Sequence, residues 1–131
     1  MLARTGPAAR LRGHRHRRRT RLLDEKAWRR PLFVVEHAPF EDVHYLGQSV
    51  EIDLTVAIAY SGSMQIELIQ QNDAGPSPYR DFIAEHGPGL HHLAVFADDF
   101  DDTVWLAQAS GEAATFTGSI TGFGRFAIST R

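Results

Sequence analysis

The sequence contains no cysteine, and this absence excludes two kinds of site at once. Without thiols the chain can form neither a disulfide nor a metal site with thiolate ligands. Any bound metal must therefore be held by histidine, aspartate, glutamate or backbone oxygen atoms. A cytoplasmic location is the default expectation for a chain without cysteine.

Long apolar runs are absent as well. No segment approaches the roughly 20 apolar residues that a membrane-spanning helix needs, and no apolar core of a signal peptide follows Met1. The chain has 131 residues, of which 43% are hydrophobic and 23% charged, which is typical of one globular domain. We therefore expect no membrane partner.

Basic residues are scarce in most of the chain and concentrated at its start. Residues 1–31 carry eleven Arg and Lys side chains against two carboxylates, a net charge of +9, whereas residues 32–131 carry three against fourteen, a net charge of −11. Such an arm could bind nucleic acid, but "RLRGHRHRRRTR" has no aromatic side chain for stacking on bases and no helical apolar period. We expect residues 1–20 to be a disordered arm, and we do not expect nucleic acid as a partner.

Beyond the arm, hydrophobic periodicity and turn residues predict several strands and three helices. Residues 49–60 alternate apolar with polar side chains, which predicts a long, half-buried strand, and "SGS" predicts a tight turn into a partner strand. Ser77 with Pro78 predicts the start of a helix that Gly87 ends. The complete prediction is helices at 21–30, 77–86 and 100–110, strands at 32–37, 49–60, 64–71, 90–97, 112–120 and 122–130, and a loop or irregular edge at 38–48.

The order of these elements predicts the α+β class, with an open, curved antiparallel sheet. The predicted order of elements is helix-β-β-β in the first half and β-α-β-β in the second half. This order indicates that one module occurs twice. This predicts a single domain at 21–131, made of module one (21–72), a linker helix (73–88) and module two (89–131). On the helix at 100–110, the expected core face is Phe100, Val104, Leu106 and Ala107.

Two strands carry polar residues that could take part in chemistry. Gln65 and Glu67 share one face of the strand at 64–71, and His91 and His92 stand at the start of the strand at 90–97. Neighbouring residues on a strand point to opposite faces, so only one of the two histidines can face a cleft. On the pattern alone, a solvated glutamate and a structural histidine are favoured over a pair of ligands. A weaker candidate is the polar cluster around His37 and His44 in "EHAPFEDVHY".

The stretches "DLTVAIAYSGSMQIELIQ" (53–70) and "GPGLHHLAVFADDFDDT" (87–103), with "SPYRDFIAEHG" between them, resemble one known family. They are similar to the vicinal oxygen chelate superfamily of glyoxalase I, methylmalonyl-CoA epimerase, bleomycin-resistance proteins and extradiol dioxygenases. The resemblance covers residues 32–131 and is closest to the glyoxalase-like, epimerase-type branch. It implies paired βαβββ modules that form an open sheet around a metal cleft.

The resemblance also implies site residues. Carried over by position, the metal ligands are Glu67 and His92, which leaves His91 on the other face, and the ion is divalent Zn, Co, Ni, Mn or Fe. Gln65, on the face of Glu67, belongs to the substrate cleft. The family's first and last strands, each with a further ligand, have no counterpart in this sequence, and His14 or His16 in the basic arm are poor substitutes.

Two functions follow from the resemblance. The first is a metal-dependent epimerase, isomerase or lyase that removes a proton next to a metal-bound carbonyl or acyl-thioester, with low activity in this form because two ligands are missing; its catalytic base is unassigned. The alternative is a non-catalytic small-molecule-binding protein of the bleomycin-resistance type, with a cleft lined by Phe96, Trp105 and Phe116. Both imply a small-molecule ligand and a homodimer.

Overall fold

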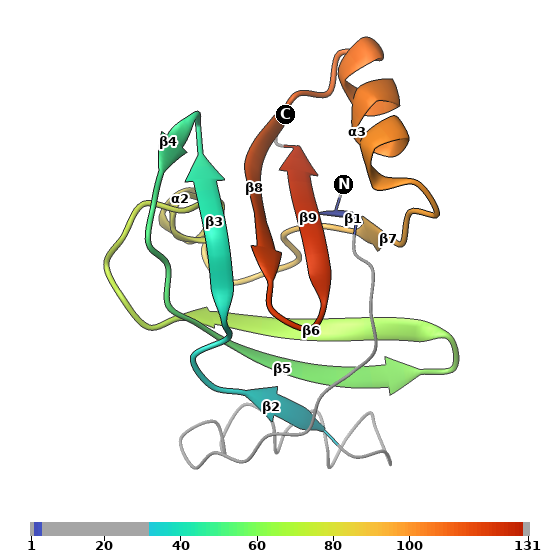
Figure 1. Ribbon diagram of the computed structural model, residues 1–131. Coiled ribbons are helices and arrows are strands. Elements are labelled where there is room, and N and C mark those ends of the chain that lie inside the picture. The colour runs from blue at the N-terminus through green and yellow to red at the C-terminus, as the bar shows by residue number, and fades with distance from the viewer. Residues whose placement is uncertain (1, 4–31, 130–131) are drawn as a thin grey trace. The chain divides into compact units, whose positions relative to one another are not determined.

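The computed structural model of the chain describes residues 2–3 and 32–129. These residues fall into two compact units, which we name the large unit (2–3, 39–52 and 73–129) and the hairpin unit (32–38 and 53–72). The elements, labelled in Figure 1, are β1 (Leu2–Ala3), β2 (Phe33–Val35), β3 (Phe40–Tyr45), β4 (Gln48–Ser49), β5 (Leu54–Ser61), β6 (Met64–Gln71), α2 (Pro78–His86), β7 (Ala94–Val95), α3 (Phe100–Ala109), β8 (Ala114–Ile120) and β9 (Gly124–Ser129).

Each unit contains one open sheet. The large unit has six strands in the order β4-β3-β8-β9-β1-β7, antiparallel except for the β1–β7 pair, and the hairpin unit has three antiparallel strands in the order β2-β5-β6. With helices α2 and α3 these sheets make a mixed α/β fold, and the predicted class with open antiparallel sheets is confirmed. Within the described residues, no helix is both long and apolar enough to span a membrane.

The core of the large unit is built around Phe116 on β8, whose side chain is fully buried. Its ring meets those of Tyr45 and Tyr79 edge-on, with centroids 6.1 and 5.7 Å away, and lies 5.2 Å from the ring of Phe126. Gly118 makes this packing possible, because a Cβ atom there would stand only 2.9 Å from the Phe126 ring. The core is therefore aromatic and closely packed.

Both helices in the described part begin and end where the sequence predicts. The Ser77 hydroxyl accepts a hydrogen bond from the Arg80 backbone N–H at 3.0 Å, and Gly87 ends α2 with φ of +73°. Asp99 caps α3 by accepting from the N–H of Asp102 at 3.0 Å. The predicted core face of α3 is wrong at Leu106, which is 60% exposed.

The segment at 38–48, predicted as a loop or irregular edge, is not a loop: it forms β3 and β4, at one edge of the six-stranded sheet. Strand β3 pairs with β8, but its register shifts between Glu41 and His44, and Asp42 has φ of +51°. Such a bulge inserts an extra residue and interrupts the alternation of apolar and polar side chains. The apolar residues Val43 and Tyr45 are buried, yet the period-two signal that would reveal the strand is broken.

The hairpin unit confirms the turn and corrects the strand before it. Strands β5 and β6 pair from Ser61↔Met64 to Leu54↔Gln71, and the two-residue turn contains Gly62 with φ of +61°. The strand predicted for 49–60 begins only at Leu54. The alternation predicts that one face of this strand is exposed, but every residue from 54 to 59 is buried. Burial on both faces is usual for a central strand.

Two other expectations concern the beginning of the chain. The helix predicted at 21–30 lies outside the described residues, as does most of the basic arm. Leu2–Ala3, however, form strand β1 between β9 and β7, so the expectation that residues 1–20 lack regular structure is wrong at these two positions.

Candidate functional site

Glu67 stands on an apolar face of the hairpin unit's sheet. Its cross-strand partner on β5 is Ile58, whose own partner on β2 is Phe33. Residues directly opposite each other in a sheet share a face, so the carboxylate lies in a row with two large apolar side chains. Ile58 is buried and Glu67 is half-buried, which makes Glu67 a positioned carboxylate rather than a freely solvated one.

A chain of hydrogen bonds fixes the Glu67 carboxylate from one side. The Tyr60 hydroxyl donates to Gln65 Oε1 at 2.8 Å, and Gln65 Nε2 donates to Glu67 Oε1 at 2.6 Å. The sequence identified Gln65 and Glu67 but missed Tyr60. The signal was present, because the two-residue turn predicted from "SGS" sets Tyr60 directly opposite Gln65.

His91 and His92 are in direct contact in the large unit. Their Nδ1 atoms are 2.9 Å apart and their rings are nearly perpendicular, with centroids 5.1 Å apart. The prediction that they point to opposite faces of a strand is therefore wrong. Regular strand structure begins only at Ala94, so the period-two rule does not apply to the two residues.

Aromatic side chains of α2 surround His91. The rings of Tyr79 and Phe82 lie 5.0 and 5.1 Å from its imidazole, the second edge-on. Burial lowers the pKa of His91, opposed in part by a hydrogen bond with the backbone of Pro78. The neutral imidazole, which is the form that binds metals, is therefore favoured at position 91.

The three aromatic residues assigned to a cleft lie in different surroundings. Phe96 and Trp105 are 62% and 64% exposed, whereas Phe116 has no exposed surface and belongs to the core. Phe96 follows β7 and Trp105 lies on α3, in a stretch that exposes several large apolar side chains: Leu90, Leu93, Val95, Phe96, Trp105 and Leu106.

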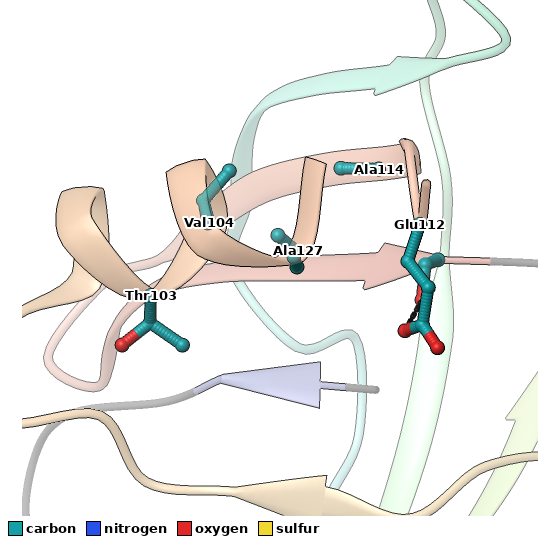
Figure 2. Close-up of a pocket in the computed structure, with 7 residues that line it drawn as sticks. Thr103, Val104, Glu112, Ala114 and Ala127 are labelled. Atoms are coloured by element: carbon teal, nitrogen blue, oxygen red, sulfur yellow. Dashed lines mark hydrogen bonds between the residues drawn. The ribbon is translucent and has the colours of Figure 1, made fainter. Parts of the chain in front are cut away.

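A small cavity lies between α3 and the β8–β9 hairpin (Figure 2). Its lining includes Val104 and Ala107 from the helix and Ala127 from β9, and Ser129, which also lines it, donates a hydrogen bond to Glu112 at 3.3 Å. Its volume of about 20 Å³ is room for roughly one water molecule. This cavity cannot hold a substrate.

The weaker candidates, His37 and His44, have separate hydrogen-bond partners. His37 belongs to the hairpin unit and donates from Nδ1 to Asp53 at 2.9 Å, while His44 in the large unit donates to the carbonyl of Asp42 at 3.0 Å. Asn72 also donates to Asp53, and this bond, followed by that of His37, lowers the pKa of the Asp53 carboxyl. Asp53 thus anchors the start of β5.

The two predicted metal ligands provide suitable donor atoms but not a complete ligand set. A carboxylate and an imidazole suit divalent Zn, Co, Ni, Mn or Fe. Glu67 belongs to the hairpin unit and His92 to the large unit. Across residues 32–129, where side chains are described, no three histidine, aspartate or glutamate side chains gather around a point where an ion could bind.

Comparison with families of known proteins matches residues 17–127 to the Glyoxalase/Bleomycin resistance protein/Dioxygenase superfamily. This match covers most of the chain and includes residues of both units. A comparison with curated proteins found no match.

Proposed function

Because the chain belongs to the Glyoxalase/Bleomycin resistance protein/Dioxygenase superfamily, we propose that it is a metal-dependent epimerase, isomerase or lyase acting on a small molecule. The reaction proposed is removal of a proton next to a carbonyl or acyl-thioester, as in the epimerase-type branch. Glu67 and His92 are the proposed metal ligands, and the cytoplasm, which the lack of cysteine favours, is the proposed location.

The observation that carries this proposal is the chain of hydrogen bonds from Tyr60 through Gln65 to Glu67. Carboxylates that bind metals are themselves held by hydrogen bonds from neighbouring residues, which orient them and tune their basicity. A glutamate that served only to solubilise the sheet would need no such support. Its position in a row with Ile58 and Phe33 adds an apolar surrounding that strengthens its interaction with a cation.

Each residue has a separate task in the proposed reaction. The Gln65 amide holds Glu67 Oε1 in one orientation, and Tyr60 holds the amide. A divalent ion bound by Glu67 and His92 would polarise the substrate carbonyl and so acidify the neighbouring C–H bond. Because only two protein side chains would bind the ion, we expect the affinity for the ion to be low and proton removal to be slow.

The first prediction tests the role of Glu67. Glu67→Gln keeps the shape of the side chain but removes its charge, so we expect the affinity of the full chain for Co²⁺ or Zn²⁺ to fall about tenfold or more. Titration calorimetry measures the affinity, and deuterium incorporation into a methylmalonyl-type thioester measures proton removal. Glu85→Gln, at a carboxylate that is 76% exposed on α2, is the control and should change neither. If Glu67→Gln binds metal as the unaltered chain does, the proposed site is wrong.

We also propose that the chain forms a homodimer through the exposed apolar stretch of the large unit. Strand β7 is at the edge of the six-stranded sheet, and Leu93, Val95 and Trp105 expose 75%, 48% and 64% of their surfaces nearby in sequence. A sheet edge beside apolar side chains is a surface to which a second chain readily adds. A second copy satisfies both features by pairing edge with edge.

The second prediction follows from this surface. Trp105→Asp should weaken the dimer by tenfold or more, since a large aromatic residue at an interface usually contributes about 2 kcal/mol or more. Light scattering coupled to size-exclusion chromatography, over a range of concentrations, measures the change. Leu46→Asp is the matched control, because Leu46 is 62% exposed elsewhere in the large unit. A monomeric unaltered chain, or equal effects of both substitutions, would contradict the proposal.

A further inference from the structure

We propose that His91 and His92 bind one divalent transition-metal ion together, through their two Nδ1 atoms. The inference deepens the proposed function and rests on it for the role of His92. It adds His91 as a donor, which no comparison assigns, and it makes the adjacent pair a chelate.

The spacing of the two nitrogen atoms supports a chelate. A metal–imidazole bond measures about 2.0–2.1 Å, so two nitrogen atoms at right angles about one ion are roughly 3 Å apart. The two Nδ1 atoms are separated by 2.9 Å. In the metal-free chain this contact is a hydrogen bond, in which one ring donates and the other accepts. Transfer of that proton to the Nε2 atom of the donor ring would leave a lone pair on each Nδ1 atom, and a rotation of the rings would bring both lone pairs to one ion.

The contact of His91 with Pro78 supports the same role. Proline has no N–H group, so the bond between His91 and the Pro78 backbone must run from the imidazole to the carbonyl oxygen. With Nδ1 directed at His92, Nε2 is the nitrogen left to donate. Histidines that bind metals almost always donate their second ring nitrogen in this way, which fixes the tautomer and leaves the first nitrogen with its lone pair.

Aromatic packing keeps the two imidazole rings together before an ion arrives. Tyr79 lies 5.0 Å from His91 and 6.3 Å from His92, and Phe82 packs edge-on against His91. Side chains that are already ordered lose little freedom on binding, which favours affinity. Imidazole donors without carboxylates select Cu²⁺, Ni²⁺ and Zn²⁺ over Mg²⁺ and Ca²⁺.

The test measures copper and nickel binding in the full chain with His14→Gln and His16→Gln, because "HRH" in the basic arm can bind these ions itself. In this background, His91→Gln and His92→Gln should each lower the affinity for Ni²⁺ by tenfold or more. Electron paramagnetic resonance of the Cu²⁺ complex should show two bound imidazole nitrogens, and one in either variant. His86→Gln, at a histidine that is 55% exposed on α2, should leave both measurements unchanged.

The outcomes separate this inference from the proposed function. If His91→Gln binds as the background chain does while His92→Gln and Glu67→Gln lose affinity, the chelate is wrong and the proposed site stands. If both histidine variants lose affinity and Glu67→Gln does not, the chelate is supported and the role of Glu67 fails. A measurement without site variants guards against misfolding: Zn²⁺ should shift the ¹⁵N resonances of both Nδ1 atoms, and a shift at only one would overturn the proposal.

Discussion

Replacing Phe116 by alanine is expected to lower the free energy of unfolding by about 3–5 kcal/mol, the usual cost of removing a buried aromatic ring. The ring is fully buried and touches those of Tyr45, Tyr79 and Phe126. Removing the ring loses buried apolar surface and edge-to-face contacts. It also leaves a cavity, because the strands around it can move together only partly. Unfolding in urea, followed by circular dichroism, measures the change.

Phe96→Ala is the matched control for this prediction. The same ring is removed there from a position that is 62% exposed, so stability should change by only about 0.5 kcal/mol. A loss at Phe116 of similar size to that at Phe96 would mean that Phe116 does not lie in a packed core. Phe116 would then again be a candidate for the lining of a substrate cleft.

The features that the sequence predicted correctly depend on short-range rules. Ser77 and Gly87 mark the ends of α2 because capping involves only residues within one helical turn. The β5–β6 register follows from the two-residue turn at Gly62, and that register brings Gln65 and Glu67 to one face. In these segments a residue's neighbours in sequence are also its neighbours in space.

The features that it missed depend on partners far away in the chain. Strand β3 is stabilised by pairing with β8, about 75 residues later, and its bulge at Asp42 hides the alternation. The contact between His91 and His92 arises because regular structure starts only at Ala94, while α2 supplies the aromatic rings around them. The period-two rule holds only within a regular strand, and the chain has none at the two histidines.

The last prediction concerns Tyr45 and alkaline pH. Its hydroxyl donates to Asp81 Oδ2 at 2.6 Å, and the side chain is 9% exposed. Burial, followed by the hydrogen bond and the negative charge of Asp81, raises the pKa of Tyr45 to about 12 from its ordinary value of 10.0. All these effects act against a phenolate in the folded chain.

A raised pKa in the folded state makes stability fall with rising pH in one window. Below pH 10 both the folded and unfolded states carry the proton, so Tyr45 causes no pH dependence there. Between about pH 10 and 12 the unfolded state loses the proton first and is therefore stabilised relative to the folded state. One pKa unit corresponds to about 1.36 kcal/mol, so we expect Tyr45 to cost about 2–3 kcal/mol of stability across this window.

Tyr45→Phe removes the hydroxyl group that titrates, so it should also remove the loss of stability that Tyr45 causes between pH 10 and 12. At neutral pH the variant loses a hydrogen bond to a carboxylate and should be less stable by about 1.5–3 kcal/mol. Because it has no phenol to titrate, its disadvantage should shrink between pH 10 and 12, as urea unfolding at a series of pH values would show. The ultraviolet absorbance of phenolate, compared between the two proteins, gives the midpoint of Tyr45 directly. A midpoint near 10, with a constant stability difference across the window, would show that Asp81 and burial do not hold the proton on Tyr45.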